Sequence, residues 1–502
     1  MINNIKSINR SFHHIFGIYN NALYKVFKLG ILLGFINSGI AFGQKTVGLI
    51  KSSPGFTEQG YILFAPLYCK TTYLIDRCGR QINSWKSNYN PGYSAYLLPD
   101  GSLLRAGHAN DSFYDYGGKG GILEKFDWNS KLVWTYKISN DSLVQHHDFF
   151  PMDNGHILIV AWHGITKQAA AEKGRLPGSI FGKRLCSERI IEIKPKGKND
   201  AEIVWQWSLW DHVAQEDNPM KPGFTNLSTH PELLNINYGQ FNPSDWIHVN
   251  SIDYNKELDQ IVISSHRLSE IWIIDHSTTT MEASSHSGGK YGKGGDFLYR
   301  WGNPEAYKNG TALNQKLFKQ HSVHWIPKGF KDEGDIMIFN NGTGRDSSYS
   351  AIDIISVPVT SPGNYVQTLP YGPQTAKWTY KDSIPTNFFS PFQSGTQRLY
   401  NGNTLICGGP QGRIFEINEK NKIVWEYINP VSRGDSIIID GIAPLKNSLF
   451  NSIYYKETYS AFKGRHFLPG APIENKPIRY ICNITTHVSA KTKKTCRNLF
   501  RK

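Results

Sequence analysis

Ile271-Trp272-Ile273-Ile274-Asp275, followed by Trp301, is one copy of a recurring pattern that decides the fold. The pattern is an alternating apolar strand, a short polar turn, a second strand and a tryptophan. Six copies end in tryptophans spaced 47 to 96 residues apart: Trp85, Trp134, Trp205, Trp301, Trp378 and Trp425. The two shortest intervals, 47 and 49 residues, indicate the basic unit, and the longer intervals indicate loop insertions.

Further hairpins lie between these units and turn at Gly101, Gly155 and Gly402, for example. Two hairpins give four strands per unit. Six such units predict an all-β chain, a six-bladed β-propeller with four-stranded blades and N- and C-terminal extensions. A β-sandwich with coincidental tryptophans is the alternative. The ring is expected to close by pairing residues 60–66 with a strand at residues 437–445, which would remove an open edge.

The net charge of +14 lies mostly in the two ends of the chain. Residues 1–43 hold four basic and no acidic residues, and residues 491–502 hold six basic and no acidic residues. The rest therefore carries a charge of +4, which argues against a broad nucleic-acid surface.

An apolar run at residues 29–35 follows two lysines and precedes small residues up to Gly43, a pattern typical of a secretory signal. We expect export to the periplasm or the outside, with cleavage near Gly43; an uncleaved N-terminal membrane anchor is the alternative. The expected domains are residues 1–43, the signal peptide or anchor, residues 55–464, the catalytic propeller, and residues 465–502, a basic tail.

The six cysteines suit an exported protein. Cys69 and Cys78 flank an expected hairpin, and Cys482 and Cys496 lie in the tail, so both pairs are plausible disulfides. Cys186 and Cys407 are expected to be buried thiols. The chain has no C-x-x-C pair, which argues against a structural zinc site of that kind.

Aligning the inner hairpins on their turns places five residues at one position, eight residues before each turn. They are Tyr93, His147, His248, His321 and Ser394. The position lies near the start of each innermost strand, so three imidazoles are expected to face one central site. The register selects His147 over its neighbour His146, because a slip of one residue moves a side chain to the other face.

The second strand of each hairpin returns to the same end of the blade. It brings His163 near His147, His266 and Arg267 near His248, and Asn340 and Asn341 near His321. Imidazoles, a guanidinium and amides suit a tetrahedral oxyanion such as sulfate or phosphate. Three imidazoles could instead bind zinc, with Asp148 and Asp245 supporting them. We favour the oxyanion because Arg267 would repel a cation, and we predict no metal and no cofactor.

Several motifs together resemble the bacterial arylsulfotransferases, or aryl-sulfate sulfotransferases. The resemblance covers residues 60–449 and is strongest in Asp245-Trp246-Ile247-His248-Val249-Asn250, Tyr299-Arg300-Trp301-Gly302-Asn303-Pro304, Gln320-His321 and Phe339-Asn340-Asn341-Gly342. It implies a six-bladed propeller in the periplasm that moves sulfuryl groups from aryl sulfate donors to phenolic acceptors, independently of PAPS, by a ping-pong mechanism.

The resemblance also assigns roles to residues. His321 corresponds to the transiently sulfated nucleophile, and His248, His147 and an arginine bind the sulfuryl group. In the family the arginine directly follows the Ser-Ser pair, whereas here His266 holds that place and Arg267 comes next. We expect Asn250, Asn340, Asn341, Tyr93 and His163 to contact substrate. The alternatives are a non-catalytic exported propeller that binds an anionic or aromatic ligand, and a metal-dependent hydrolase.

Overall fold

A computed structural model describes residues 45–474, apart from residues 54, 56, 177, 181–183 and 240–243. The chain divides into residues 1–45 and residues 46–502, and every element below belongs to the second unit. The expected signal segment and most of the basic tail lie outside the described residues. None of the helices in the described ranges is long and apolar enough to cross a membrane.

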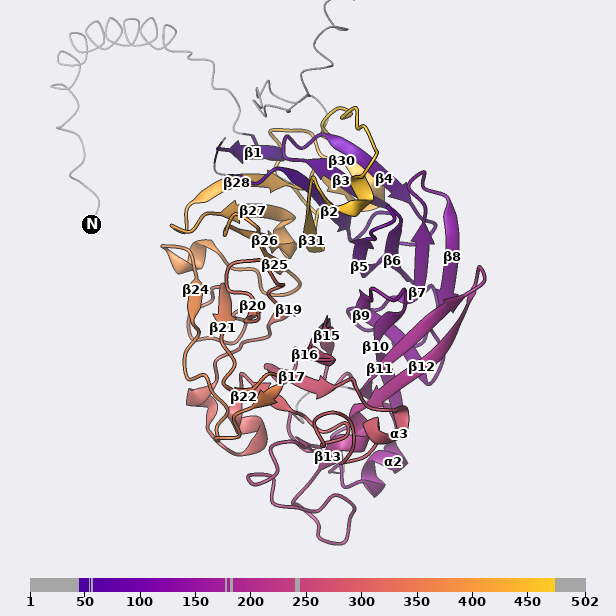
Figure 1. Cartoon of the computed structure of the whole chain (residues 1–502), viewed down its shortest axis with the longest axis vertical. Coiled ribbons are helices and arrows are strands. Elements are labelled where there is room, and N and C mark those ends of the chain that lie inside the picture. The colour runs from indigo at the N-terminus through magenta and orange to yellow at the C-terminus, as the bar shows by residue number, and fades with distance from the viewer. Residues whose placement is uncertain are drawn as a thin grey trace, which may run out of the picture. The chain divides into compact units, whose positions relative to one another are not determined.

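Six antiparallel, four-stranded sheets are arranged as the blades of a propeller (Figure 1). The first three blades, written from the innermost strand outward, are β31–β2–β3–β4, β5–β6–β7–β8 and β9–β10–β11–β12. Their bounds are β31 Leu449–Lys456, β2 Gly60–Pro66, β3 Thr71–Asp76, β4 Gln81–Lys86, β5 Pro91–Leu97, β6 Leu103–His108, β7 Gly121–Phe126, β8 Leu132–Lys137, β9 Leu143–Pro151, β10 Ile157–Thr166, β11 Arg184–Lys196 and β12 Asp200–Ser208.

The other three blades are β15–β16–β17–β18, β19–β20–β21–β24 and β25–β26–β27–β28, and β1 adds a fifth, outermost strand to the last one. Their bounds are β15 Val249–Asn255, β16 Gln260–Ser265, β17 Glu270–Asp275, β18 Tyr299–Trp301, β19 His321–Trp325, β20 Ile336–Asn340, β21 Ala351–Ile355, β24 Trp378–Tyr380, β25 Gly395–Arg398, β26 Thr404–Gly408, β27 Arg413–Ile417, β28 Ile423–Ile428 and β1 Gly48–Ser52. The predicted six-bladed propeller is confirmed.

Short elements occupy the connections between strands. The described helices are α2 Lys167–Glu172 and α3 Thr280–Ala283, with 3-10 turns η1 Leu209–His212, η2 Pro304–Tyr307, η3 Ala312–Asn314, η4 Pro385–Asn387, η5 Gly409–Gln411, η6 Arg433–Asp435 and η7 Ser460–Phe462. Two-residue or three-residue strands pair as β13 Val213–Ala214 with β14 Leu234–Asn235, β22 Val359–Ser361 with β23 Asn364–Tyr365, and β29 Val431–Ser432 with β30 Ser436–Ile437.

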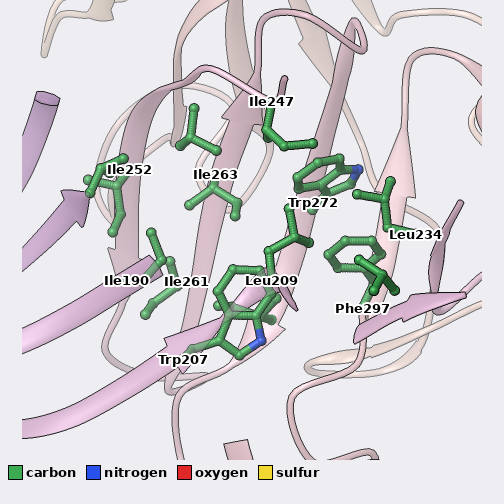
Figure 2. Packing of buried hydrophobic residues seen from close by; sticks show 14 of the residues in the cluster. Ile190, Trp207, Leu209, Leu234, Ile247, Ile252, Ile261, Ile263, Trp272 and Phe297 are labelled. Carbon is green, nitrogen blue, oxygen red and sulfur yellow. The ribbon is translucent and has the colours of Figure 1, made fainter. Parts of the chain in front are cut away.

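The middle strands of a blade are apolar on both faces because a neighbouring blade packs against each face. In β16, Ile261 and Ile263 belong to the core shared with the third blade, whereas Val262 belongs to the core shared with the fifth blade. Figure 2 shows Ile261 and Ile263 packed with Trp207 and Leu209 in the first of these cores. The alternation of a strand thus distributes its side chains between two interfaces.

The recurring tryptophans connect each blade to the next. Their indole N–H groups donate across the blade boundary in five cases: Trp85 to the carbonyl of Asp127 (2.9 Å), Trp134 to that of Asp200 (3.0 Å), Trp205 to the hydroxyl of Thr278 (3.2 Å), Trp301 to the carbonyl of Pro373 (2.9 Å) and Trp425 to that of Arg77 (2.8 Å). The last bond joins the sixth blade to the first. A buried indole needs such an acceptor, which explains why the repeat carries tryptophan.

The ring closes by pairing two distant segments, but the predicted closing strand is wrong. The strand that pairs with β2 is β31, at residues 449–456. Residues 438–448 instead form turns and irregular chain, and Ile439, Ile442 and Leu445 are exposed there. These apolar residues are spaced by three, whereas a strand buried on one face needs a spacing of two.

The expected Cys69–Cys78 disulfide is also wrong. Cys69 is a buried free thiol, so it is not bonded to Cys78. The two residues lie at opposite ends of β3, and six strand residues span about 20 Å, whereas disulfide-bonded Cα atoms lie about 4.4–6.8 Å apart. Cys186 and Cys407 are buried thiols, as predicted. Cys482 and Cys496 lie outside the described residues.

Candidate active site

Four imidazole rings form a continuous row across three blades. The ring centroids of His147 and His248 are 4.4 Å apart, those of His248 and His266 are 5.1 Å apart, and those of His266 and His321 are 5.3 Å apart. The structure thus brings together the three histidines that share one register position, and it adds His266. We call these four residues the imidazole row.

The backbone at the shared register position is left-handed. The φ angles are 89° at Tyr93, 48° at His147, 56° at His248 and 84° at Ser394, and in the fifth blade the left-handed residue is Ser322, at 51°. The pairing register also shifts next to the histidines in β9, β15 and β19. Such bulges re-aim side chains, and strained backbone of this kind is concentrated at functional sites.

His321 has a defined tautomer. The amide nitrogen of Asn341 donates to the carbonyls of Ser390 (2.7 Å) and Gln393 (3.0 Å), so its oxygen faces His321 Nδ1 at 2.8 Å. His321 Nδ1 therefore carries the hydrogen and Nε2 carries the lone pair. The N–H of Gln393 donates to that Nε2 at 3.2 Å. Burial lowers the pKa of His321 to about 3, so the ring is neutral at physiological pH.

His248 is held by a buried carboxylate. Its Nδ1 hydrogen bonds to Asp245 Oδ2, and Asp245 Oδ1 accepts the indole N–H of Trp162 at 3.1 Å. Burial acts to raise the pKa of Asp245, but His248 and Arg267 outweigh it and hold that pKa below its usual value. Asp245 therefore stays ionised and orients His248 through Nδ1.

His266, and not Arg267, occupies the place in the row. His266 is half-buried among charged and imidazole neighbours, and desolvation lowers its pKa well below the usual value. Its Nδ1 is buried and has no hydrogen-bond partner among the described residues. Arg267 Nη2 lies 3.5 Å from Asp245 and the side chain is 28% exposed, so the guanidinium contacts the site through that carboxylate. An unpartnered buried ring nitrogen indicates a ligand position.

The other predicted substrate residues have different surroundings. Tyr93 packs its ring against His147 at 5.2 Å, and its hydroxyl accepts the N–H of Gly118 at 3.0 Å. Asn250 donates to the carbonyl of Gln320 at 2.7 Å, while its own amide oxygen is buried without a partner in the described part of the chain.

Asn340 and His163 serve other contacts. Asn340 donates to the carbonyl of Lys316, in the loop before its own blade, and to Asp353, on its own blade. His163 lies 3.2 Å from Arg189, and it is the neighbouring residue, Trp162, that contacts the histidines. Consecutive strand residues point to opposite faces, which explains why His163 does not join the row.

Sequence reasoning missed a hydrogen-bonded pair behind His147. His146 Nδ1 lies 2.9 Å from His147 Nδ1, and its Nε2 lies 2.9 Å from Glu188. The ring of His146 stacks on Trp162 at 4.1 Å. Burial raises the pKa of Glu188 well above its usual value. It lowers the pKa of His146 well below its usual value. The adjacent His-His dipeptide was the available signal.

Two further residues near the row were missed. Phe450 lies 5.1 Å from the ring of Tyr93 and 6.3 Å from that of His321; it lies on β31, the strand whose position was predicted wrongly. Lys319 Nζ donates to the carbonyl of Arg267 at 2.9 Å, and burial lowers its pKa to about 8. Its position two residues before His321 was the only sequence signal.

A cavity of about 140 Å³ lies at the centre, next to the row. Its lining includes Phe450, Asn250, Ser394 and two carboxylates, Asp148 and Asp253. Burial raises the pKa of Asp148 to about 6. The innermost strands therefore surround a polar cavity with one aromatic wall.

Comparisons with known proteins found similar solved structures and one family. Solved structures with similarity include a protein of unknown function from Bacteroides caccae (TM-score 0.41, 10% identity, covering 79% of this chain and 98% of that one). AztD from Citrobacter koseri is also similar (TM-score 0.35, 8% identity, covering 80% of this chain and 98% of that one). So is virginiamycin B lyase from Staphylococcus aureus (TM-score 0.33, 10% identity, covering 79% of this chain and 92% of that one). No curated protein matches the chain.

The family comparison covers most of the propeller. The model of the family described as arylsulfotransferase (ASST) matches residues 70–438, a range that contains the whole imidazole row. The chain belongs to the arylsulfotransferase family.

Proposed function

We propose that the chain is an aryl-sulfate sulfotransferase that moves a sulfuryl group from a phenolic sulfate ester to a phenolic acceptor through a sulfated His321. The observation that carries the proposal is the imidazole row itself. A neutral His321 with a fixed Nδ1–H has its nucleophilic lone pair on Nε2, and the other rings of the row lie beside it.

In the first half-reaction, Nε2 of His321 attacks the sulfur atom of the aryl sulfate. The N–S bond forms while the bond between sulfur and the phenolic oxygen breaks, and the phenolate leaves with the electron pair. An acceptor phenol then attacks the sulfur through its oxygen, the N–S bond breaks, and His321 is released. The proton that the acceptor loses to solvent balances the proton that the departed phenolate takes up. Splitting one transfer into two displacements is the general advantage of a covalent intermediate.

His147 supplies a donor for the sulfuryl oxygens. With Glu188 protonated and His146 neutral, Glu188 donates to His146 Nε2, and His146 Nδ1–H donates to His147 Nδ1. The remaining hydrogen of neutral His147 is then on Nε2, which makes that atom a donor. His266, whose Nδ1 has no partner, replaces the arginine that the family places after the Ser-Ser pair.

The N–H of Gln393 has a part in the same step. It donates to the lone pair of His321 Nε2 in the free protein, so it must leave that atom when the N–S bond forms. A sulfuryl oxygen on Nε2 would be the new acceptor, which is how backbone donors stabilise developing negative charge. Tyr93 and Phe450 provide aromatic surface for the aryl group.

A second candidate is a non-catalytic propeller that binds an anionic or aromatic ligand. The observation in its favour is that the N–H of Gln393 donates to the lone pair of His321 Nε2, the proposed nucleophilic atom.

We further propose export to the periplasm on the basis of residues 1–43. A metal hydrolase at the row receives no support, because the row is not among the described groups whose ligand atoms converge within 4.8 Å.

The test is chemical trapping. The protein is mixed with p-nitrophenyl sulfate without an acceptor, and peptides are analysed by mass spectrometry for a sulfated His321. The expected result is one nitrophenolate released per chain, then turnover when phenol is added. The His321→Ala variant should neither release nitrophenolate nor turn over with phenol. His230→Ala changes an exposed histidine paired with Glu232 and should behave as the original chain does. Nitrophenolate release that survives in His321→Ala would exclude the mechanism.

A further inference from the structure

The insertion between β17 and β18, which the proposed transfer does not use, holds a second cluster of ligand-type side chains. His286 and Asp296 lie in this insertion, and His212 ends η1. Their ligand atoms all lie within 4.8 Å of one another, and no other group of three or more His, Cys, Asp or Glu in the described ranges does so. We propose that these three residues bind one divalent transition-metal ion, zinc being the ion that fits.

The hydrogen bonds of His212 create a need for a cation. Its Nε2–H donates to the carbonyl of Ala283 at 2.9 Å, so Nδ1 of the neutral ring carries a lone pair. That Nδ1 lies 2.7 Å from Asp296 Oδ1, which also offers lone pairs. His286 Nδ1 lies 2.8 Å from the same oxygen. Either a second proton on His212 or a metal ion would satisfy the two facing acceptors, His212 Nδ1 and Asp296 Oδ1. The presence of a third ligand atom, His286 Nδ1, favours the metal ion.

The surroundings of His212 match those of a metal-bound histidine. Such histidines usually donate the other ring N–H to a carbonyl or carboxylate, which fixes the tautomer and the ring plane. Here the ring is fully buried and lies parallel to Trp207, at an interplanar angle of 3°. Trp207 in turn donates to the carbonyl of Gly295 at 2.7 Å and packs beside Phe297 (Figure 2). The ligand is therefore held in place before an ion arrives.

The solvent side of the site leaves room for a fourth ligand. The side chain of His286 is 62% exposed, whereas that of Asp296 is 6% exposed. Two imidazoles, one carboxylate and a water form a common tetrahedral zinc set, with ligands about 2.0–2.2 Å from the ion. The contact of 2.8 Å between His286 Nδ1 and Asp296 Oδ1 is shorter than that set requires, so binding moves His286 outward, which its exposure permits. The contact of 2.7 Å between His212 Nδ1 and Asp296 Oδ1 must lengthen as well, which needs a shift of the Asp296 carboxylate.

The choice of ion follows from the donors. Imidazole nitrogen suits zinc and its neighbours, whereas magnesium and calcium prefer oxygen-only sets. Bound zinc would tie the insertion after β17 to η1 at the end of β12, and so join two blades. Anything that binds only the folded state raises its stability by mass action.

The site is tested with zinc alone. The full chain, purified without a histidine tag and stripped with a chelator, is titrated with zinc chloride by calorimetry. We expect one ion per chain, and His286→Ala and Asp296→Asn should each weaken binding at least tenfold. Zinc should raise the melting temperature of the original chain and leave that of His286→Ala unchanged. His230→Ala removes another exposed histidine paired with an acid, Glu232, and should bind zinc as the original does.

Two results would overturn the proposal. One is the lack of stoichiometric zinc binding by the stripped chain, which would mean that His212 and Asp296 form a simple ion pair. The other is zinc binding that persists in both His286→Ala and Asp296→Asn. Because His286 is exposed, its substitution leaves the core intact, so a loss of binding cannot be attributed to unfolding. Neither readout depends on sulfuryl transfer.

Discussion

The chemistry of the imidazole row depends on where each ring carries its hydrogen. Asn341 fixes the hydrogen of His321 on Nδ1, and Asp245 does the same for His248. Behind His147, a neutral Glu188 reverses the order and places the hydrogen of His147 on Nε2. In the proposed transfer one ring is thereby the nucleophile and another a donor, although both are neutral imidazoles.

The buried state of His321 predicts how stability depends on pH. Its pKa is about 3 when folded and 6.5 in the unfolded reference. Between these values the unfolded chain binds the extra proton, so stability rises with pH and is lost as pH falls below 6.5. His321→Gln should reduce the slope of the free energy of unfolding against pH. The reduction is at most about 1.4 kcal/mol per pH unit, the contribution of one proton. Urea unfolding at several pH values measures it; an unchanged slope would contradict the burial argument.

Glu188 offers a test of the proton arrangement. Glutamine cannot ionise, yet its amide can donate to His146 as a protonated Glu188 would, and its oxygen can still accept the N–H of Val249. Glu188→Gln should therefore keep transfer activity within about threefold, while Glu188→Ala should lower kcat by about 10-fold to 100-fold. Equal losses in the two variants would indicate that an ionised Glu188 is needed.

The exchange of arginine for histidine after the Ser-Ser pair predicts unequal roles for two neighbours. His266→Ala removes a ring that lies beside His321 and should lower kcat by about 10²-fold. Arg267→Ala affects the row only through Asp245 and should have a smaller effect, about 10-fold at most. Steady-state rates with p-nitrophenyl sulfate and phenol compare them, and a larger loss at Arg267 would reverse the assignment.

At the scale of elements, the loop between β6 and β7 holds the first histidine of the row. Gly118 has φ +102°, and a Cβ at this position would overlap the ring of His147. The carbonyl of Gly118 also accepts the N–H of His147 at 2.7 Å. The loop therefore packs on the ring without an intervening side chain, as only glycine allows.

Gly118→Ala should displace His147. We expect a loss of about 1–3 kcal/mol in the free energy of unfolding, together with reduced sulfuryl transfer. Gly117→Ala is the matched control, since a Cβ there meets nothing within 4 Å. Urea unfolding and steady-state kinetics on both variants decide the matter. Equal behaviour of the two variants would show that the loop yields without moving the ring.

At the scale of the whole molecule, the last blade must join the first as firmly as any other pair. Trp425 donates to Arg77 across this junction, and Trp85 donates to Asp127 between the first and second blades. β31 adds the other part of the closure by pairing with β2 along its length. An unclosed ring would leave the edge of β2 exposed.

Trp425→Phe and Trp85→Phe should therefore both destabilise the propeller. Trp425→Phe leaves the buried carbonyl of Arg77 without its donor, at a cost of about 1–3 kcal/mol, and Trp85→Phe, whose acceptor Asp127 is half-buried, should cost no more than that. Thermal unfolding should stay a single transition in both. A separate early transition in Trp425→Phe alone would show that the closing junction is weaker than the others and that the ring opens there first.

The fold could be predicted from the sequence because its determinants are local and repeated. Strand alternation and outer tryptophans recur in every blade, and turn glycines recur in most of them, so an error in one copy does not disturb the rest. The closing strand occurs once, and its pairing spans nearly 400 residues, so no repeat pointed to it. Phe450 was missed at the site for the same reason.

Local pattern was enough to give the strand order within blades and to place His147, His248 and His321 at the same end of the innermost strands, since both follow from the period of a strand. The tertiary structure alone decided that His266 joins the row while Arg267 turns to Asp245, that Cys69 stays a thiol, and that β31 closes the ring. These outcomes depend on backbone bulges and on contacts between distant segments, and neither leaves a local pattern in the chain.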